Sequence, residues 1–241
     1  MKNIKKKKPR KGCKDIWDAF MVDGANFTEN DIPVCPTTAL AIPSKIITYS
    51  EAKTIHNKRI KEDKNYFFDA FVCFYEHDQN FDGVRSGIWY YPKKAYEILK
   101  HFKGIITPDF STYQDFPEPL KKWNTYRMRA FGYWYGTMCR KQVINNVRWG
   151  TKETYDYCFD GIEENSTVAI GTVGGSPYKL IDRERFEKGL FEMVRKLKPR
   201  CIIVYGSASY PCFEKLRKEG ILILQFDGRT ASFYKGRRDA R

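Results

Sequence analysis

The sequence has little that would place the protein in a membrane or outside the cell. It contains no apolar run long enough to cross a bilayer, and its basic start, MKNIKKKKPRKG, lacks the apolar stretch that a secretion signal needs. Its seven cysteines are odd in number and never form a CxxC pair, which argues against a disulfide framework and against a zinc ribbon. We therefore expect a cytoplasmic protein with no membrane partner and with reduced, mostly buried thiols.

Several catalytic and nucleotide-binding motifs are also missing. The chain has neither the HExxH sequence of zinc proteases nor the GxSxG turn of serine hydrolases. Its glycine-rich turn, Gly174-Gly175-Ser176, matches neither the GxGxxG fingerprint nor the P-loop pattern. His77 lies beside two acids but has no second histidine near it in sequence, so we predict no metal site there. These absences leave the reaction open, if there is one.

The size and the charge of the chain divide it into three parts. With 241 residues, 42% of them apolar, the chain suits one sizeable domain. Residues 1–14 hold eight lysines or arginines and no acid, and residues 229–241 hold five against a single aspartate. The two ends therefore carry twelve of the fourteen net positive charges, and the body is nearly neutral. We divide the chain into a basic disordered tail (1–14), one α/β domain (15–228) and a basic C-terminal tail (229–241).

The basic tails are the candidate nucleic-acid contacts. Lysine runs of this kind attract phosphate backbones of DNA or RNA without sequence specificity, although they are also common on disordered termini that bind nothing. A strongly basic groove in the body is the less favoured place for such contacts. The residues we assign to nucleic-acid binding are Lys5, Lys6, Lys7, Lys8, Arg10, Lys11, Arg237 and Arg238.

Strand-like and helix-like stretches alternate along the body. The central unit, 104–150, reads as a short strand, a polar turn, a long helix that Pro117 and Pro119 open, and a second strand that stops at Asn145-Asn146. Further strands are predicted at 46–49, 66–75, 167–173, 201–205 and 221–226, and further helices at 51–61, 92–102, 182–197 and 212–219, with short helices at 16–20 and 155–159. Ser50 is the predicted cap of the first long helix.

This alternation predicts an α/β fold of repeated βα units with a mostly parallel sheet. Helix-sized connections throughout and polar strand ends along the whole chain favour a barrel-like or incomplete barrel over an open doubly wound sheet. In both arrangements ligands bind at the carboxyl ends of the strands. The oligomeric state stays open.

Polar residues that follow the predicted strands are the candidate site. The candidate catalytic residues are Asp78, Asp109, Asn146 and Asp227, which could divide acid and base work or bind a divalent cation such as magnesium. For each acid, capping of the next helix is the simpler interpretation. The candidate ligand-binding residues are Arg127, Trp149, Thr172, Gly174, Gly175, Ser176, Tyr205 and Ser207. The glycine turn is also explained as a plain tight turn.

Arg127 decides whether the central helix is structural or functional. It lies four residues after Trp123 and four before Phe131, on the face that we predict to pack inward with Trp134 and Met138. A charge is rarely buried without a partner. We favour an ion pair, with Asp109 or Asp160 as the acid, over an arginine that reaches into the cleft to hold a phosphate or a carboxylate.

Several segments resemble a bacterial domain family of unknown function, number four-four-one-seven. The resemblance rests on GIITPDFSTYQDFPEPLKKWNTYRMRAFGYW, VINNVRWG, TYDYCFDGI, STVAIGTVG, FEKGLFEMVRKLKP and IIVYG, and it covers roughly residues 30 to 226 without the two tails. It implies a protein of a phage or another mobile element, without an established activity, fold or catalytic residue.

Three functions are consistent with these observations. The one we predict first is a nucleic-acid-associated protein of a mobile element, held to the phosphate backbone by its tails, and the other two are alternatives to it. The second is an enzyme that acts on a phosphorylated or sugar-containing substrate in a cleft at the carboxyl ends of the strands, with Asp109, Asn146 and Asp227 as its polar centre. The third is a binding module without chemistry.

Overall fold

The computed structural model describes residues 2–3, 15, 17–172 and 180–228. The candidate residues Gly174, Gly175 and Ser176 lie outside the described residues, and so do the candidate nucleic-acid contacts Lys5, Lys6, Lys7, Lys8, Arg10, Lys11, Arg237 and Arg238. Lys2–Asn3, which the sequence assigns to the first tail, form a short strand, β1, that pairs antiparallel with β2, Asn26–Phe27.

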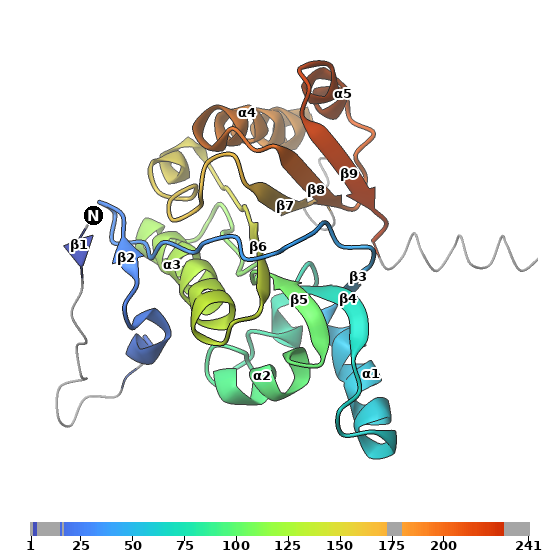
Figure 1. Cartoon of the computed structure of the whole chain (residues 1–241). Helices are drawn as coiled ribbons and strands as arrows, with labels where there is room; N and C mark the ends of the chain where they lie inside the picture. The colour runs from blue at the N-terminus through green and yellow to red at the C-terminus, as the bar shows by residue number, and fades with distance from the viewer. Residues whose placement is uncertain (1, 4–14, 16, 173–179, 229–241) are drawn as a thin grey trace, which may run out of the picture.

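A parallel sheet of seven strands forms the centre of the domain (Figure 1). Each strand pairs with its neighbours in sequence, so the order never reverses as it does in a doubly wound sheet. The predicted α/β fold is therefore confirmed, in its barrel-like form: the sheet curls into a half-barrel. Its strands are β3 (Ile46–Thr48), β4 (Phe68–Cys73), β5 (Phe102–Ile106), β6 (Gln142–Asn146), β7 (Thr167–Gly171), β8 (Cys201–Tyr205) and β9 (Leu222–Phe226).

The curl brings distant strands together on the inner face. Tyr75, just after β4, stacks on Tyr205 at the end of β8 with ring centroids 5.4 Å apart. A Cβ atom on Gly171 of β7 would lie only 2.5 Å from the Tyr75 ring, so only glycine permits this approach. The inner face is filled by apolar side chains, including Phe71, Cys73, Ile106, Ile144, Ala169 and Ile203.

Five α-helices of the described chain cover the outside of the curl (Figure 1). They are α1 (Tyr49–Glu62), α2 (Pro92–Leu99), α3 (Glu118–Tyr133), α4 (Leu180–Leu197) and α5 (Pro211–Lys218). A core between β4–β6 and α1–α3 includes Val72, Ile105, Val143, Leu99, Met128 and Phe131, and a core between β7–β9 and α4–α5 includes Ile170, Val204, Ile223, Leu190, Met193 and Phe213. None of the described helices is both long and apolar enough to cross a membrane.

Two local predictions differ from the structure. The cap of α1 is Thr48 rather than Ser50, because the Thr48 hydroxyl accepts from the Glu51 N–H while the Glu51 carboxylate accepts from the Thr48 N–H. The inward face of α3 does not extend to Met138, which is exposed because the helix passes into a π-helical segment, Trp134–Met138. Shorter 3-10 segments occur at Ala19–Val22, Asp78–Asn80 and Lys152–Asp156.

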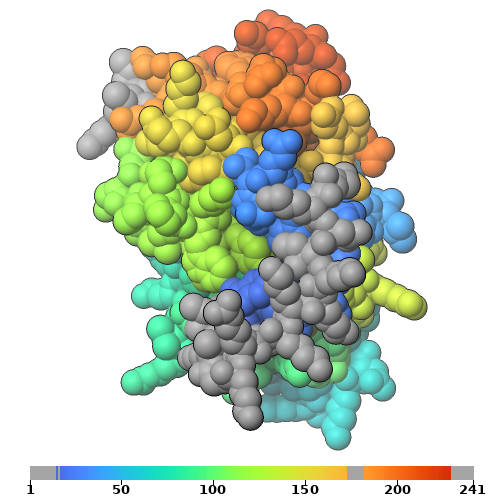
Figure 2. All heavy atoms as spheres, turned by 90° about the vertical axis from the view of Figure 1, so that its left-hand side faces the viewer, coloured from blue at the N-terminus to red at the C-terminus, as the bar shows by residue number. Residues whose placement is uncertain are grey.

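The residues before β3 pack against α3 and the segment that follows β6. Tyr133 of α3 donates to the Asp23 carbonyl, and the Asn30 amide donates to the Asp156 carbonyl and to the Asp160 carboxylate. In the space-filling view these blue residues lie between the green of α3 and the yellow of the segment after β6 (Figure 2). The α3 helix is therefore covered on a second side as well as by the sheet.

Strand β6 is the point where the sheet divides. Its first residues pair with β5, while Asn145 and Asn146 pair with β7. The lead-in segment, residues 17–45 before β3, lies beside the first half, since the N–H groups of Thr38 and Ala39 both donate to the Val143 carbonyl at 3.1 Å. Beside the second half, the Asn146 N–H donates to the Thr107 hydroxyl at 2.8 Å. This division places Asn146 at the carboxyl edge, with its side chain turned to its neighbours after β4 and β5.

Candidate functional site

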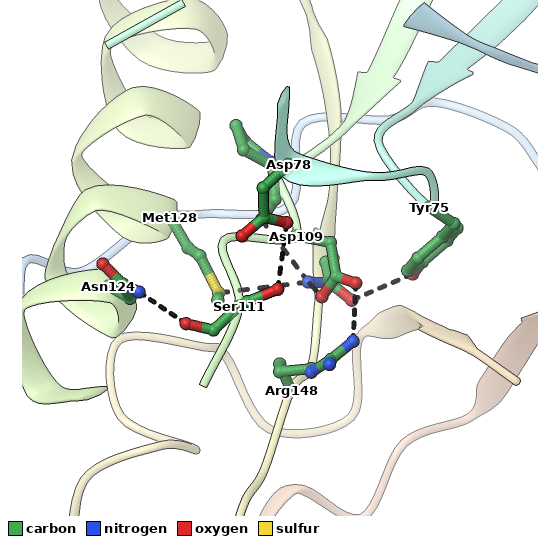
Figure 3. A network of polar contacts seen from close by, with 9 residues as sticks. Tyr75, Asp78, Asp109, Ser111, Asn124, Met128 and Arg148 are labelled. Atoms are coloured by element: carbon green, nitrogen blue, oxygen red, sulfur yellow. Dashed lines mark hydrogen bonds and ion pairs between the residues drawn. The ribbon is translucent and has the colours of Figure 1, made fainter. Parts of the chain in front are cut away.

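A polar network lies at the carboxyl ends of β4, β5 and β6 (Figure 3). Asp109 is its centre and is almost fully buried. Its carboxylate accepts from the Asn146 amide at 2.8 Å and, through the other oxygen, from Arg148 Nη1 at 2.8 Å. The Tyr75 hydroxyl donates to the Asn146 amide oxygen at 2.9 Å. Three consecutive strand ends are thus joined by side chains whose donors and acceptors match.

A buried arginine holds Asn146 in this position. Arg129 of α3 is fully buried and donates to the carbonyls of Asn146, Cys158 and Asp160 at 2.9, 3.2 and 3.0 Å. Burial lowers the pKa of Arg129 to about 10, well within the range where the guanidinium stays charged at neutral pH. Arg129 therefore fixes the backbone of Asn146 from behind the site.

Asp78 lies beside the network and has a different environment from Asp109. The Ser111 hydroxyl donates to its carboxylate at 2.9 Å, and Asp78 is only partly buried. Burial, and then the nearby charges of Asp109 and Asp82, raise the pKa of Asp78. A carboxyl group of this kind is suited to giving or taking a proton.

Arg127 forms an ion pair, as favoured from the sequence, but both predicted partners were wrong. Its guanidinium binds Asp82 through two hydrogen bonds of 2.6 and 2.9 Å and also donates to the Asn124 amide oxygen. Asp109 is paired with Arg148, and Asp160 accepts instead from Thr28 and Asn30. The Arg127 guanidinium also lies 3.9 Å from the Phe110 ring centroid.

A hollow of about 310 Å³ opens beside the network, where β5, β6 and β7 end. Arg148 belongs to both, because it contacts Asp109 and also lines the hollow. The hollow has polar and aromatic walls, made by Thr112, Tyr113, Gln114, Val147, Arg148, Trp149, Gly150, Ile170, Gly171, Asp182, Arg185 and Phe186. Such a position is where parallel α/β folds bind ligands.

The other candidate residues lie at several places on the carboxyl edge. Asp78, Asp109 and Asn146 are brought to the network, and Trp149 lines the hollow with its indole packed against Gly189 of α4. Thr172 donates through its hydroxyl to the Ser207 carbonyl at 3.1 Å and through its N–H to the Tyr205 carbonyl.

Asp227 does not line the hollow. It follows β9, where its carboxylate accepts from Gln225 at 3.3 Å. Its place as a third member of the polar centre therefore stays a prediction, while Asp109 and Asn146 are in contact.

The expectation of a divalent cation such as magnesium stays a prediction. Within the described ranges, no group of three or more histidine, cysteine or acidic side chains is placed to hold a metal ion. Magnesium often takes only one or two protein carboxylates and keeps its waters, so the absence of a larger group among the described residues does not decide the matter. The six described cysteines are free, and all but Cys139 are buried.

Several residues of the network could not be selected from the sequence. Arg148 lies two residues after Asn146, so alternation along an extended segment would have placed both on one side. Tyr75 ends a predicted strand that is rich in aromatic residues, and this pattern favours a buried apolar position over a polar contact. No sequence pattern near Ser111 or Arg129 indicates that they belong to the network. Ser111 contacts Asp78, 33 residues earlier in the chain, and Arg129 contacts Asn146, 17 residues later.

Comparisons with known proteins agree with the resemblance seen in the sequence. The chain is 37% identical over 119 residues to "Gene 1 protein" of Mycobacterium phage L5, covering 49% of this chain and 51% of that protein. It is 35% identical over 138 residues to "Gene 1 protein" of Mycobacterium phage D29, covering 57% and 48%. The chain thus spans about half the length of the curated relatives it matches, which support a phage-encoded protein.

No solved structure matches the chain. Residues 27–227 match the family described as a domain of unknown function (DUF4417), and the chain belongs to that family.

Proposed function

We propose that this domain is an enzyme that binds a phosphorylated or sugar-containing small molecule in the hollow at the carboxyl ends of β5, β6 and β7. The observation that carries the proposal is the double position of Arg148, which lines the hollow and holds the buried Asp109 at 2.8 Å. A ligand in the hollow would therefore lie beside a fixed carboxylate and the amide of Asn146.

The size and the walls of the hollow support a small ligand. Its volume of about 310 Å³ is at the lower end of the range of ligand sites, roughly 300 to 1,000 Å³. Apolar side chains of Val147, Trp149 and Phe186 line the hollow together with polar groups of the loop after β5. Such a mixture suits a ring with polar substituents.

The two carboxyl groups support different chemical roles. Asp109 is held by an arginine and an amide, so its position is fixed. Asp78, with its raised pKa and its single hydroxyl donor, is the candidate for proton transfer. Ser111, which binds Asp78, precedes Thr112 in the wall of the hollow. If a ligand binds and is not changed, the domain is a binding module with the same site.

A thermal-shift screen tests the proposal. The full chain is mixed with nucleotides, sugar phosphates and sugars, each with and without magnesium, and a ligand at one hundred times its dissociation constant stabilises the fold by about 2.7 kcal/mol. The stabilisation should be lost in Arg148→Gln. It should persist in Arg195→Gln, which removes an exposed arginine of α4 outside the hollow. The absence of a shift with every compound would contradict the proposal.

Nucleic-acid association is a second candidate function, supported by the location of the charge. The two tails carry twelve of the fourteen net positive charges. The relatives are phage proteins, and many phage proteins work on DNA or RNA. Each phosphate contact that is lost should lower the slope of log affinity against log salt by about one.

A tail variant that has lost half of the eight positive charges of residues 1–14 tests this second function. Changing Lys5, Lys6, Lys7 and Lys8 to glutamine leaves β1 intact and should weaken duplex or single-strand binding and flatten its salt dependence. The control changes four exposed lysines of the body, Lys58, Lys61, Lys64 and Lys93, in the same way. Equal affinities of the wild type and the tail variant at low salt would remove this function.

A further inference from the structure

A buried hydroxyl that lines the hollow has no partner among the described residues. Thr112 is 6% exposed and lines the hollow, yet no group of the described chain forms a hydrogen bond with its Oγ1. Leaving a buried hydroxyl without a partner is unfavourable, and native structures contain few such groups. A ligand that accepts a hydrogen bond from Thr112 would explain why this position is not a valine.

Two arginines from different elements line the same hollow, and each has N–H groups that form no hydrogen bond with the described chain. A guanidinium carries five N–H donors. Arg148, after β6, uses Nη1 for Asp109, and Arg185, on α4, uses Nη1 for the Gln114 side chain at 2.7 Å. Within the described residues the other donors of both groups make no hydrogen bond. The hollow is therefore lined by guanidinium donors that have no acceptor in the described chain.

The start of α4 adds positive potential to the hollow. The helix has 18 residues, and side chains of its first two turns line the hollow, so the positive end of its dipole is nearby. One opposing charge is present, because Asp182 also lines the hollow, with a carboxylate oxygen 3.9 Å from Arg185 Nη1. That distance is long for an ion pair, and both side chains are exposed, so Arg185 remains available to a ligand.

We infer that the hollow binds a phosphate ester, with the phosphate held by Thr112, Arg148 and Arg185 and the organic ring placed against Trp149 and Phe186. The inference rests on the proposed function and narrows it, since it selects a phosphorylated ligand over a neutral sugar. The indole of Trp149 and the ring of Phe186 lie 5.5 Å apart and form one aromatic wall. A nucleoside monophosphate, free or at the end of a nucleic acid, has the matching chemistry.

Calorimetric titration of the full chain tests the inference with three probes: a nucleoside 5′-monophosphate, the same nucleoside without phosphate, and inorganic phosphate. The monophosphate should bind at least about tenfold more tightly than the nucleoside, because hydrogen bonds to a charged group are the strong ones. A 5′-phosphorylated oligonucleotide, compared with its unphosphorylated form, shows whether the phosphate can belong to a nucleic acid.

Thr112→Val separates a ligand contact from a structural role. The variant should bind the monophosphate about three- to tenfold more weakly, from the loss of one hydrogen bond, while its melting temperature does not fall. The control, Thr125→Val, removes a buried hydroxyl that donates to the Lys121 carbonyl and lies outside the hollow, so the affinity should stay unchanged.

A second pair of variants keeps the test independent of the threonine. Arg185→Gln should weaken the monophosphate about tenfold or more, and Arg195→Gln, on the same helix outside the hollow, should not. Equal binding of nucleoside and monophosphate, or full affinity in both Thr112→Val and Arg185→Gln, would overturn the phosphate site and leave the ligand proposal standing. Failure of every ligand to bind would remove both.

Discussion

Two arginine–aspartate pairs lie close to the same edge of the sheet and differ in how completely the arginine is used. Arg127 binds both oxygens of Asp82, and the two side chains are 9% and 16% exposed. Arg148 binds one oxygen of Asp109, and the side chains are 27% and 8% exposed. In the first pair Phe110 also covers the guanidinium; in the second the arginine faces the hollow.

This difference separates a structural pair from a candidate functional one. The forked geometry of Arg127 is matched by a carboxylate and by the Asn124 amide, while its Nε, which has no partner among the described residues, is buried and outside the hollow. Arg148 keeps donors and solvent access while its aspartate stays buried. Both pairs consist of an arginine and an aspartate. They differ in whether the arginine has N–H donors that a ligand in the hollow could reach.

The largest expected effect is the loss of stability in Arg127→Met. Methionine fills similar space but leaves the charge of Asp82 without its partner, and such a change costs about 3 to 5 kcal/mol. The free energy of unfolding, measured by urea denaturation, should fall by that amount, and Asp82→Asn added to Arg127→Met should recover much of it. Ligand affinity of the folded protein should stay the same.

An unchanged stability together with lost ligand binding would reverse the comparison. It would move the functional site from Arg148 onto α3. A matched reference is Arg195→Gln, whose exposed ion pair with Glu192 should change stability by no more than about 1 kcal/mol.

Arg148→Gln should have a smaller effect on stability and a larger one on binding. Asp109 loses a charged donor but keeps the Asn146 amide, so we expect about 1.5 to 3 kcal/mol of destabilisation. Binding of a phosphate ester should be lost. Urea denaturation and calorimetry on the same sample measure both quantities, and retained binding would show that the pair only supports the fold.

The fold could be predicted because its signals are local. The continuous apolar run of β8 was predicted with the bounds that the structure has, Cys201–Tyr205, and β-branched runs separated by capped helices predicted the other strands within a few residues. The α1 cap was missed by two residues because Thr48 and Ser50 are both good caps, and the reciprocal bond to Glu51 decides between them.

The site could be predicted only in part. Its ion pairs join residues of different loops and helices, and which of them come into contact depends on the folded chain. Asp109 and Asn146 could be predicted because parallel α/β folds bind ligands at the carboxyl ends of their strands. That rule uses only the position of a residue in the sequence and not its contacts. Asp82 lies 45 residues before Arg127, in the loop after β4, and nothing in the sequence brings it to α3. Arg129 was missed because its burial requires cover from both the sheet and the lead-in segment.

The pH dependence of stability should reveal the raised pKa of Asp78. Its pKa is raised above the ordinary 3.8 by burial and by Asp109 and Asp82, so the folded state holds the proton more tightly than the unfolded state. Stability from this group is complete below about pH 4 and is lost as the pH rises through the raised pKa.

Asp78→Asn isolates this effect, since the asparagine oxygen can still accept from Ser111 and cannot ionise. The stability of the wild type relative to the variant should decline from about pH 4 upward and then level off. Asp18, whose pKa burial raises to about 6, titrates in both proteins and cancels in the difference. A constant difference across this range would show that Asp78 has an ordinary pKa and would weaken its role in proton transfer.

The smallest expected effect on stability concerns a third pair, Arg185 and Asp182, which is exposed and 3.9 Å long. Asp182→Asn removes a first-turn acid of α4 and should lower the free energy of unfolding by less than about 1 kcal/mol. In contrast, affinity for a nucleoside monophosphate should rise about two- to fivefold, because the competing carboxylate is gone and Arg185 is free to bind the phosphate. Calorimetry at low salt measures the change, and high salt should reduce it. A fall in affinity would mean that Asp182 helps to hold the ligand, for example by accepting from a ring hydroxyl or amine, and the anion would then be placed nearer to Arg148 and Thr112 than to α4.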